Sequence, residues 1–407
     1  MERIALLSFH GCPYAKIGDR DTGGMNIYVL KLAEELGRLG LIVDVFTRIH
    51  DMTDPVIVDI SETARVIHLQ AGPPDESKTK LHNHIPKFAN ALNHFTKTNK
   101  LKYDLIYSHY WLSGVVGNQQ KTVWNVPNIS TFHTLAKPKM AANESIVESQ
   151  KRIIAEQQVL IGSDSVVVST ESEKQDIIKY YDLEGSKIHV IPAGVDLKLF
   201  RPLDKLECKN GLNITHKNVI ISVAQRIEPL KGLDLLINAL PYLKNLGDIK
   251  LLIVGGDQNS KDQIEYLMKL VSDLGLLDNV EFTGPVSQKD LVKYYNSSDV
   301  LVMPSHYETF GLAALEAQAC GLPVIAAGIG GPEVFIQNGR NGYLVPNQEP
   351  MEYAKRINQI IQNNVESNIM ALESRKTAET MSWESTAEKF INHCRSYSFK
   401  NPVTVQI

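Results

Sequence analysis

Two glutamates and a glycine stand at the start of a predicted helix in the second half of the chain. Glu308 and Gly311 lie in the sequence SHYETFGLAALE, which ends at Glu316. The first turn of a helix offers unpaired N–H groups and the positive end of the helix dipole, which together suit a diphosphate. Glu308 is placed to reach the hydroxyls of a sugar, and Glu316 those of a ribose. Two surface glutamates on an ordinary helix are the alternative.

Two cations follow another predicted strand. The apolar run Val219–Ala224 leads into QRIEPLKG, which places Arg226 and Lys231 on a strand-to-helix turn. Fixed cations at that point can neutralise a departing nucleotide without a metal ion. Taken alone, the turn reads as a solvated basic loop. Combined with the glutamate segment, it predicts a diphosphate site.

Polar residues also follow strand-like runs in the first half. Gly23 and Gly24 directly precede the first amphipathic helix, where their N–H groups can face a phosphate or a reacting sugar. His109 and His133 each follow an apolar run. An isolated histidine would be interpreted as structural. Two histidines at equivalent strand ends favour a shared ligand site, because ligands bind at that edge of a parallel sheet.

No metal or disulfide is expected. The segment 19–21 spells D-x-D, a pattern found in some metal sites, and we interpret it as a polar loop because Arg226 and Lys231 supply the positive charge. The chain has four cysteines, which are far apart and form no C-x-x-C pair: Cys12, Cys208, Cys320 and Cys394. This spacing indicates neither a disulfide framework nor a zinc site.

The elements that position these residues are short apolar runs alternating with amphipathic segments. Most runs are apolar throughout, as expected for strands covered on both faces. The predicted strands are Ile4–Phe9, Ile42–Thr47, Arg65–Gln70, Asp104–Ser108, Asn128–Phe132, Ser165–Ser169, Ile188–Ile191, Val219–Ala224, Lys250–Val254, Val280–Thr283, Val300–Met303, Pro323–Ala326 and Gly342–Val345. The pattern predicts an α/β fold of two Rossmann-like domains with parallel sheets facing a central cleft.

Glycine and proline mark the predicted boundary between the domains. They cluster in the sequence PAGVD at 192–196, and a new series of strands begins at Val219. We expect an N-terminal acceptor-binding domain at 1–194 and a C-terminal donor-binding domain at 195–382. Residues 383–407 would then form a helix that returns to the N-terminal domain.

Length and charge limit the possible functions. With 407 residues the chain is too long for a single core, and its formal net charge of −4 gives no basic field for nucleic acid. No apolar run approaches the roughly 18 residues that span a bilayer. We expect a cytoplasmic protein, monomeric or homodimeric. Peripheral contact with the inner face of the membrane stays open, although the lysines between 87 and 102 are interpreted as a solvated face.

The motifs together resemble a known family. R-x-x-x-x-K-G from Arg226, E-x-F-G-L-x-x-x-E from Glu308, the pair Gly330-Gly331 and the sequence NGRNG at 338–342 are similar to retaining glycosyltransferase family 4 over nearly the whole chain. The resemblance implies the GT-B architecture of two Rossmann-like domains. One departure concerns Glu333. Its Pro-Glu pair follows the two glycines at once, where many relatives have a gap, and we assign it no role.

The resemblance implies roles for the residues of the donor site. Arg226 and Lys231 would contact the diphosphate, Glu316 would hold the ribose, and His133 would lie beside the transferred sugar. Catalysis would involve His133, Arg226, Lys231 and Glu308. The other residues implied in donor binding are Gly23, Gly24, Val286, which lines the base slot with Gly284 and Pro285, Phe310, Gly311 and Leu312.

Three stretches are similar to a narrower group. GGMN, HYWLSG and HTL resemble enzymes that glycosylate inositol phosphate and, more distantly, sucrose-phosphate synthases. That similarity implies an acceptor site made of Asn26, Lys78, His109, Tyr110, Thr134 and Arg152. Two alternatives stay open: Lys80 competes with Lys78, and Arg152 also fits an exposed position on its helix.

The implied reaction is retaining transfer of a hexosyl group from a UDP-sugar, UDP-glucose or UDP-N-acetylglucosamine, by front-face attack and without a metal. The acceptor hydroxyl would belong to an inositol or sugar phosphate, or to an intermediate of polysaccharide or glycolipid biosynthesis. A mannosyltransferase using GDP-mannose is one alternative. A non-catalytic module that binds sugar nucleotides, without hydrolysis or transfer, is another.

Overall fold

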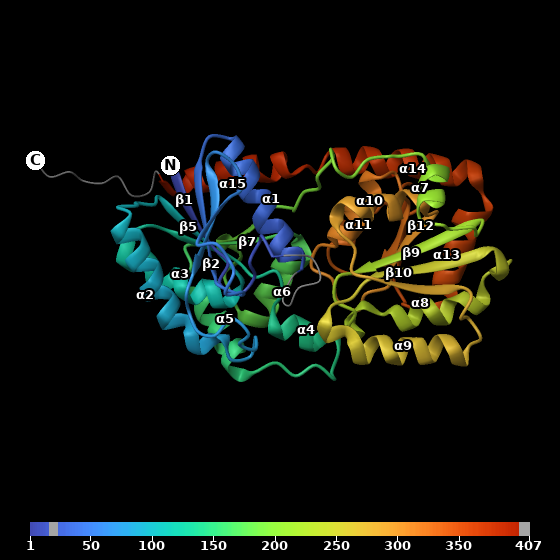
Figure 1. Cartoon of the computed structure of the whole chain (residues 1–407), viewed down its shortest axis with the longest axis horizontal. Helices are drawn as coiled ribbons and strands as arrows, with labels where there is room; N and C mark the ends of the chain where they lie inside the picture. The colour runs from blue at the N-terminus through green and yellow to red at the C-terminus, as the bar shows by residue number, and fades with distance from the viewer. Residues whose placement is uncertain (16–22, 399–407) are drawn as a thin grey trace, which may run out of the picture. The chain divides into compact units, whose positions relative to one another are not determined.

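A computed structural model describes residues 1–15 and 23–398, which divide into two compact α/β units. The first unit contains the described residues up to Pro192 together with 383–398, and the second contains Ala193–Ser382. In each unit a sheet is covered on both faces by helices (Figure 1). No helix among the residues described here is long and apolar enough to span a membrane.

The first sheet has eight strands in the order β3-β4-β2-β1-β5-β6-β7-β8. Its strands are β1 (Arg3–Leu7), β2 (Ile42–Arg48), β3 (Ile57–Asp59), β4 (Ala64–Leu69), β5 (Leu105–His109), β6 (Asn128–Thr131), β7 (Ser165–Val168) and β8 (Ile188–Val190). Its α-helices are α1 (Gly24–Arg38), α2 (Ile85–Thr98), α3 (Tyr110–Trp124), α4 (Ala136–Ala142), α5 (Gln150–Gly162), α6 (Glu171–Tyr181) and α15 (Trp383–Ser398), and short 3-10 turns occur at Leu81–His84 and Gly185–Lys187. The order reverses direction between β1 and β5, and ligands of such sheets bind beyond the strand ends at that point.

One strand of this sheet was missed by the sequence analysis, which predicted parallel strands alone. β3 pairs antiparallel with β4, with Ile57 opposite Ile67. It has three residues at the edge of the sheet, and Ile57 is exposed. A strand this short carries no readable alternation of apolar and polar residues, which explains why its sequence gave no signal.

The second sheet has six parallel strands in the order β11-β10-β9-β12-β13-β14. They are β9 (Asn218–Ala224), β10 (Ile249–Gly255), β11 (Val280–Gly284), β12 (Val300–Met303), β13 (Val324–Ala327) and β14 (Gly342–Val345). The helices are α7 (Lys205–Gly211), α8 (Leu233–Ala239), α9 (Lys261–Asp273), α10 (Gln288–Ser297), α11 (Leu312–Ala319), α12 (Pro332–Phe335), α13 (Pro350–Gln362) and α14 (Asn364–Glu379), with 3-10 turns at Pro229–Lys231, Leu240–Tyr242, Leu246–Asp248 and Gln258–Ser260. Here the order reverses between β9 and β12, which selects the loops after those two strands as the ligand site.

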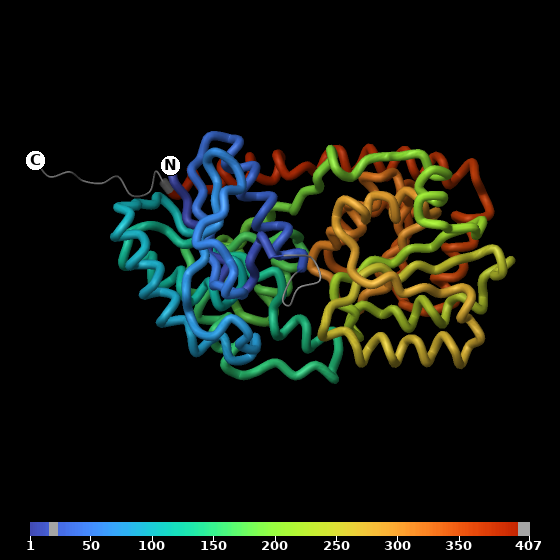
Figure 2. The backbone as a smooth tube through the Cα atoms, in the orientation of Figure 1, coloured from blue at the N-terminus to red at the C-terminus, as the bar shows by residue number. Residues whose placement is uncertain are grey.

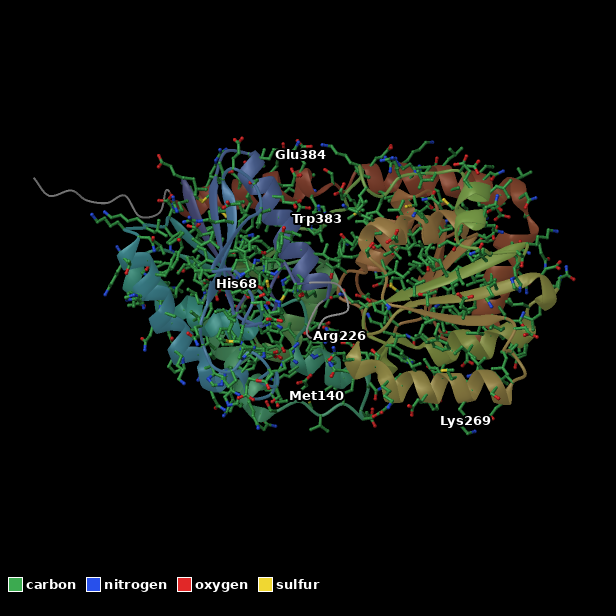
Figure 3. All side chains as sticks on the ribbon, in the orientation of Figure 1. His68, Met140, Arg226, Lys269, Trp383 and Glu384 are labelled. Atoms are coloured by element: carbon green, nitrogen blue, oxygen red, sulfur yellow. The ribbon has the colours of Figure 1, made fainter. Side chains whose placement is uncertain are left out.

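The last helix belongs to the first unit. The chain leaves the second unit at Ser382 and returns as α15, the red end of the tube in Figure 2. Its first residue, Trp383, places its ring edge-on to Tyr28 of α1 at 5.4 Å between centroids. Phe390 stacks on Tyr107 of β5 at 4.4 Å. At the surface, Glu384 forms an ion pair with Arg38 (Trp383 and Glu384 are labelled in Figure 3).

Candidate active site

The second unit holds a charged pair beyond the ends of β9 and β12. Lys231 Nζ donates to Glu308 Oε2 at 3.0 Å, although the residues are far apart in sequence. Both side chains remain partly exposed, at 26% and 14%. The predicted cation and the predicted glutamate therefore share one place. A diphosphate arriving there would compete with Glu308 for the ammonium group.

Glycines let three backbone segments meet around this pair. A Cβ on Gly232 would lie 2.2 Å from the carbonyl oxygen of Pro304, which follows β12. A Cβ on Gly330 would lie 1.9 Å from the carbonyl oxygen of Glu308, and one on Gly331 would lie 2.0 Å from that of Phe310. Only glycine allows these approaches, so the two motif glycines after β13 brace the backbone of the glutamate loop.

The loop ends at the N-terminus of α11. Gly311 is the residue that caps the helix, with φ of +85°, a conformation that favours glycine. Leu312 is the first helical residue. Phe310 is buried and its ring lies 5.7 Å from that of Phe335. The backbone N–H groups at 310–312 thus occupy a helix start held from both sides, as a phosphate-binding turn requires.

Glu316 lies inside the same helix, buried at 6% exposure. Tyr295 donates its hydroxyl hydrogen to Oε2 at 2.9 Å, and Gln288 Nε2 donates to Oε1 at 3.3 Å. Burial raises the pKa of Glu316 to about 8, and the bond from Tyr295 opposes that shift. The carboxyl group is therefore oriented but largely neutral at pH 7. Sequence patterns did not single out Gln288 or Tyr295, because neither belongs to a motif.

Arg226 and Val286 lie on loops after two strands of this sheet, β9 and β11, which β10 separates. Arg226 follows β9 and is half-buried (Figure 3). Val286, also half-buried, follows β11 and comes two residues before Gln288, whose amide reaches Glu316. All the donor residues predicted in this unit therefore follow β9, β11 or β12.

In the first unit the two predicted histidines touch. His109 Nδ1 and His133 Nε2 lie 3.1 Å apart, and the rings are nearly parallel. His109 is fully buried at the end of β5, whereas His133 after β6 is partly exposed. Burial lowers the pKa of His133 to about 3 and that of His109 well below its ordinary value. Both rings are neutral at pH 7, and only His133 is accessible.

Backbone strain marks the same place. His133 and Tyr110 both have positive φ, +59° and +73°. Residues other than glycine adopt this conformation uncommonly; it costs about 1–3 kcal/mol and concentrates at functional sites. The two residues follow β6 and β5, which are neighbours in the sheet. The fold thus sustains strain where the sequence predicts ligand contact.

The four residues predicted to hold an acceptor phosphate are close together. Lys78 Nζ lies 5.0 Å above the ring centre of Tyr110, and the Arg152 guanidinium lies 5.1 Å from it. Arg152 Nη2 also donates to Thr134 Oγ1 at 3.3 Å. Lys80, the competing residue, is exposed.

Arg152 is buried, unlike the exposed residue that its helical sequence allowed. Its Nε donates to Glu156 at 2.7 Å and its Nη1 to Glu148 at 2.9 Å. Burial raises the pKa of Glu156, an effect that Arg152 opposes. Tyr181 also donates to Glu156. The spacing of Glu148, Arg152 and Glu156, each four residues from the next, was the signal in the sequence for this network, although Glu148 precedes the first residue of α5.

Asn26 closes the first turn of α1. Its Oδ1 accepts from the N–H of Gly23 at 3.0 Å, and its Nδ2 donates to the carbonyl of Cys12 at 2.7 Å. Gly23 caps α1, and Gly24 is its first residue and exposed. The D-x-D segment lies outside the described residues. The predicted contact of Asn26 with an acceptor would have to compete with these two bonds.

Two protein-family models and several known relatives match the chain. Residues 22–199 match "Glycosyltransferase Family 4" and residues 204–377 match "Glycosyl transferases group 1". The chain is 33% identical to D-inositol 3-phosphate glycosyltransferase of Corynebacterium diphtheriae, covering 95% of this chain and 93% of the relative. It is 36% identical to the enzyme of that name from Corynebacterium urealyticum, covering 97% and 95%.

Solved structures with the same fold are also known. Sucrose-phosphate synthase from Thermosynechococcus elongatus superposes with a TM-score of 0.90 at 33% identity, covering 98% of this chain and 100% of that one. Anabaena HepE in complex with UDP and glucose gives 0.78 at 21% identity, covering 97% and 100%, which supports the fold. With two Rossmann-like units and full-length relatives of this kind, the chain belongs to glycosyltransferase family 4 and has the GT-B fold.

Proposed function

We propose that the protein transfers a hexosyl group from a UDP-sugar to a hydroxyl group of a phosphorylated polyol or sugar, with retention of configuration. Glucose and N-acetylglucosamine are the proposed sugars. The observation that carries the acceptor class is the group of Lys78, Tyr110, Thr134 and Arg152. Two cations, a hydroxyl and a strained tyrosine at one strand edge suit a phosphate monoester. The names of the relatives, inositol phosphate glycosyltransferase and sucrose-phosphate synthase, point to the same class.

The donor would bind to the second unit. Arg226 and Lys231 would neutralise the diphosphate, and the N–H groups of Phe310, Gly311 and Leu312 would bind its oxygens. Glu316 would accept hydrogen bonds from the ribose, and Val286 would line the base slot. Once Lys231 turns to the phosphate, the Glu308 carboxylate is released to accept from hydroxyls of the hexose.

The first unit would supply the acceptor and the groups around the reacting carbon. His133, held neutral, would donate or accept one hydrogen bond at the transferred sugar. Gly23 and Gly24 would face the donor, and Asn26 the acceptor ring. His109 would position His133, since it is fully buried itself. The leaving phosphate would take the acceptor proton on the face from which it departs. No step requires a metal ion.

A donor and acceptor panel tests this function. UDP-glucose, UDP-N-acetylglucosamine and GDP-mannose are each incubated with inositol phosphates, hexose phosphates, lipid-linked sugars and the unphosphorylated polyols. We expect a UDP-sugar and a phosphorylated acceptor to give product with an α linkage, detected by mass spectrometry and NMR. Transfer from GDP-mannose alone would overturn the donor assignment. Equal use of phosphorylated and unphosphorylated acceptors would overturn the acceptor class, and binding without hydrolysis or transfer would support a non-catalytic module.

A further inference from the structure

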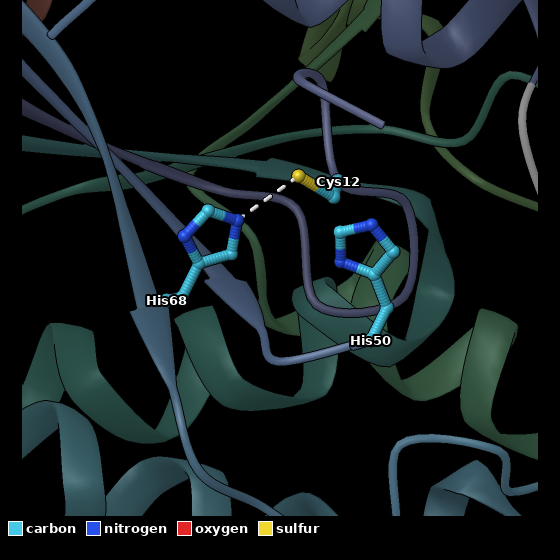
Figure 4. Close-up of side chains that lie close together, drawn as sticks. All are labelled: Cys12, His50 and His68. Atoms are coloured by element: carbon cyan, nitrogen blue, oxygen red, sulfur yellow. Dashed lines mark hydrogen bonds between the residues drawn. The ribbon is translucent and has the colours of Figure 1, made fainter. Parts of the chain in front are cut away.

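Three side chains with metal-binding atoms converge in the first unit, outside the residues assigned to transfer. They are Cys12 in the loop after β1, His50 in the loop after β2, and His68 in β4 (Figure 4). One ligand atom from each lies within 4.8 Å of the other two. Cys12 and His68 are each 4% exposed. A thiol and two imidazoles gathered in a largely buried place form the ligand set that zinc prefers.

The orientation of His68 matches that of a metal ligand. Its Nδ1 lies 2.7 Å from the carbonyl oxygen of Pro55, and a carbonyl can only accept, so Nδ1 carries the hydrogen. The other nitrogen, Nε2, therefore presents a lone pair, and it lies 3.2 Å from Cys12 Sγ (Figure 4). Metal-binding histidines usually donate their second N–H in this way, which fixes the tautomer and the plane of the ring.

A carboxylate, that of Asp54, also lies beside His50, without the hydrogen bond that holds His68. The His50 Nδ1 lies 2.8 Å from Asp54 Oδ2 but forms no hydrogen bond. The same carboxylate oxygen accepts from the backbone N–H groups of His50 and Asp51, so its position is fixed. A carboxylate behind an imidazole raises its basicity toward a metal. In both histidines Nδ1 lies next to an oxygen atom, and in His68 a hydrogen bond holds the ring.

We propose that Cys12, His50 and His68 bind a zinc ion. In tetrahedral zinc sites with Zn–S near 2.3 Å and Zn–N near 2.0–2.1 Å, sulfur and nitrogen ligands lie about 3.6 Å apart. The observed 3.2 Å between Cys12 and His68 and the 4.8 Å limit for the group need shifts of only about 1 Å to reach that geometry. Binding forms a Zn–S bond and breaks the S–H bond, and the proton passes to the buffer. Water completes the fourth position.

The ion would anchor the loop that leads to the first helix. Cys12 accepts from Asn26 through its carbonyl oxygen, and Asn26 caps Gly23 at the start of α1. Zinc on the thiolate would thus fix one end of the segment that carries Gly23 and Gly24. Metal binding itself does not depend on the proposed function. The simpler alternative is a thiol that donates to His68 Nε2 with no metal at all.

Cobalt titration of chelator-treated full-length protein distinguishes the two. We expect one Co²⁺ per chain, a sulfur-to-cobalt charge-transfer band in the near ultraviolet and tetrahedral bands in the visible, all removed by one equivalent of Zn²⁺. Cys12→Ser should abolish the charge-transfer band and weaken zinc binding by at least about 100-fold, the upper end of what outer-shell changes cost. Absence of the band in the wild-type protein, or its persistence in Cys12→Ser, would overturn the proposal.

Matched variants control for folding and for other ligands. Cys208→Ser changes a buried cysteine of the second unit, and His94→Gln an exposed histidine of the first; both should keep the full signal. Asp54→Asn retains all three ligands and should weaken zinc binding by about 10–100-fold. If Cys12→Ser fails to fold, the weaker zinc binding of Asp54→Asn and the wild-type titration still distinguish a zinc site from a thiol hydrogen bond. If the wild-type protein shows no charge-transfer band and Asp54→Asn leaves the zinc affinity unchanged, the proposal is overturned. Cys12 and His68 would then be joined only by the hydrogen bond from the thiol.

Discussion

Glu316 is a carboxyl group that the ligand-free fold keeps largely neutral. Its pKa is raised to about 8 from an ordinary value of 4.5, mainly by burial. Because the folded pKa lies above the unfolded one, the free energy of unfolding falls as the pH rises from about 4.5 through about 8. In the proposed donor site, ribose hydroxyls would donate to the ionised form and favour it. Higher pH should therefore weaken the free fold and strengthen donor binding.

Glu316→Gln should separate these two effects. The amide oxygen can still accept from Tyr295, so we expect a higher melting temperature than wild type at about pH 8.5. Donor affinity should drop about tenfold and lose its rise between about pH 6.5 and about pH 8.5, because a charge-assisted bond is lost. Calorimetric titration with a UDP-sugar and scanning calorimetry measure both. Glu333→Gln, an exposed residue without an assigned role, is the control and should change neither.

Lys231→Met removes one cation of the proposed diphosphate site. Turnover should fall by about 10²–10³, the loss seen when one preorganised electrostatic donor is removed. Glu308 would then lack its partner, so part of the loss could reflect a displaced loop. The double variant Lys231→Met/Glu308→Gln, compared with each single variant in steady-state assays, separates the two causes. Lys269→Met, an exposed helical lysine, should be silent, and normal turnover in Lys231→Met would refute the assignment.

Lys78→Met tests the acceptor phosphate without disturbing a buried charge. Arg152 is unsuitable for this test. Its removal would leave the buried carboxyl group of Glu156 without its cationic partner, which would destabilise the fold by about 3–5 kcal/mol. Loss of one bond to a charged phosphate, about 1.5–3 kcal/mol, should raise the acceptor KM about 10–100-fold and leave donor hydrolysis unchanged. Lys80→Met is the matched control. A larger effect of Lys80→Met than of Lys78→Met would reverse the choice between them.

At the scale of elements, the glutamate loop after β12 depends on the loop after β13. Gly330 and Gly339 both have positive φ, +64° and +74°. A Cβ on Gly330 meets the Glu308 carbonyl, whereas one on Gly339 meets nothing within 4 Å. Alanine substitutions at these two glycines therefore separate the cost of backbone strain from the effect of displacing the Glu308 backbone.

We expect Gly339→Ala to cost about 1 kcal/mol, the strain of a left-handed residue, and to keep donor affinity. Gly330→Ala should cost more and should weaken donor binding at least tenfold, because the Glu308 backbone must move. Chemical denaturation and donor titration measure the two quantities. Equal donor affinity in both variants would show that the Glu308 loop accommodates the methyl group elsewhere.

The elements themselves were largely predictable from the sequence. Strands that are covered on both faces consist of apolar residues throughout. The apolar run Val300–Met303 therefore identifies its strand directly from the sequence. β3 was missed because three residues at an edge, two of them exposed, carry no readable pattern. Motif spacing predicted that Lys231 and Glu308 share a site, but not that they pair. The cluster of Cys12, His50 and His68 could not be read from the sequence, since two loops and one strand, separated along the chain, bring it together.

At the scale of the whole molecule, the first unit is discontinuous in sequence. Its last helix contributes buried Trp383, Phe390 and Ile391, worth about 5–9 kcal/mol at about 1.5–3 kcal/mol each. That is comparable to the total stability of a domain. The ring of Tyr28 lies between Trp383 and His133, at 5.4 and 5.1 Å, so α15 also supports the strained histidine.

Phe390→Ala should destabilise one unit and spare the other. We expect a loss of about 3–5 kcal/mol in the first unit, since the ring that stacks on Tyr107 is removed. In scanning calorimetry one transition should move down. The transition that a UDP-sugar stabilises, assigned to the second unit, should stay in place. Lys389→Ala, the exposed neighbour, should leave both unchanged, and a joint shift in Phe390→Ala would mean that the units unfold together.

The return of α15 also sets an order of events during synthesis. Domains generally fold from the N-terminus as the chain emerges, but the first unit here lacks a helix until residues 383–398 have been made. The second unit, 193–382, can complete its own core earlier. Newly made chains would thus carry a finished second unit together with an unfinished first unit whose apolar surface is exposed. A stalled or cleaved chain ending before Trp383 would be a target for chaperones and proteases, and no chain lacking its C-terminal helix would hold a completed His133 environment.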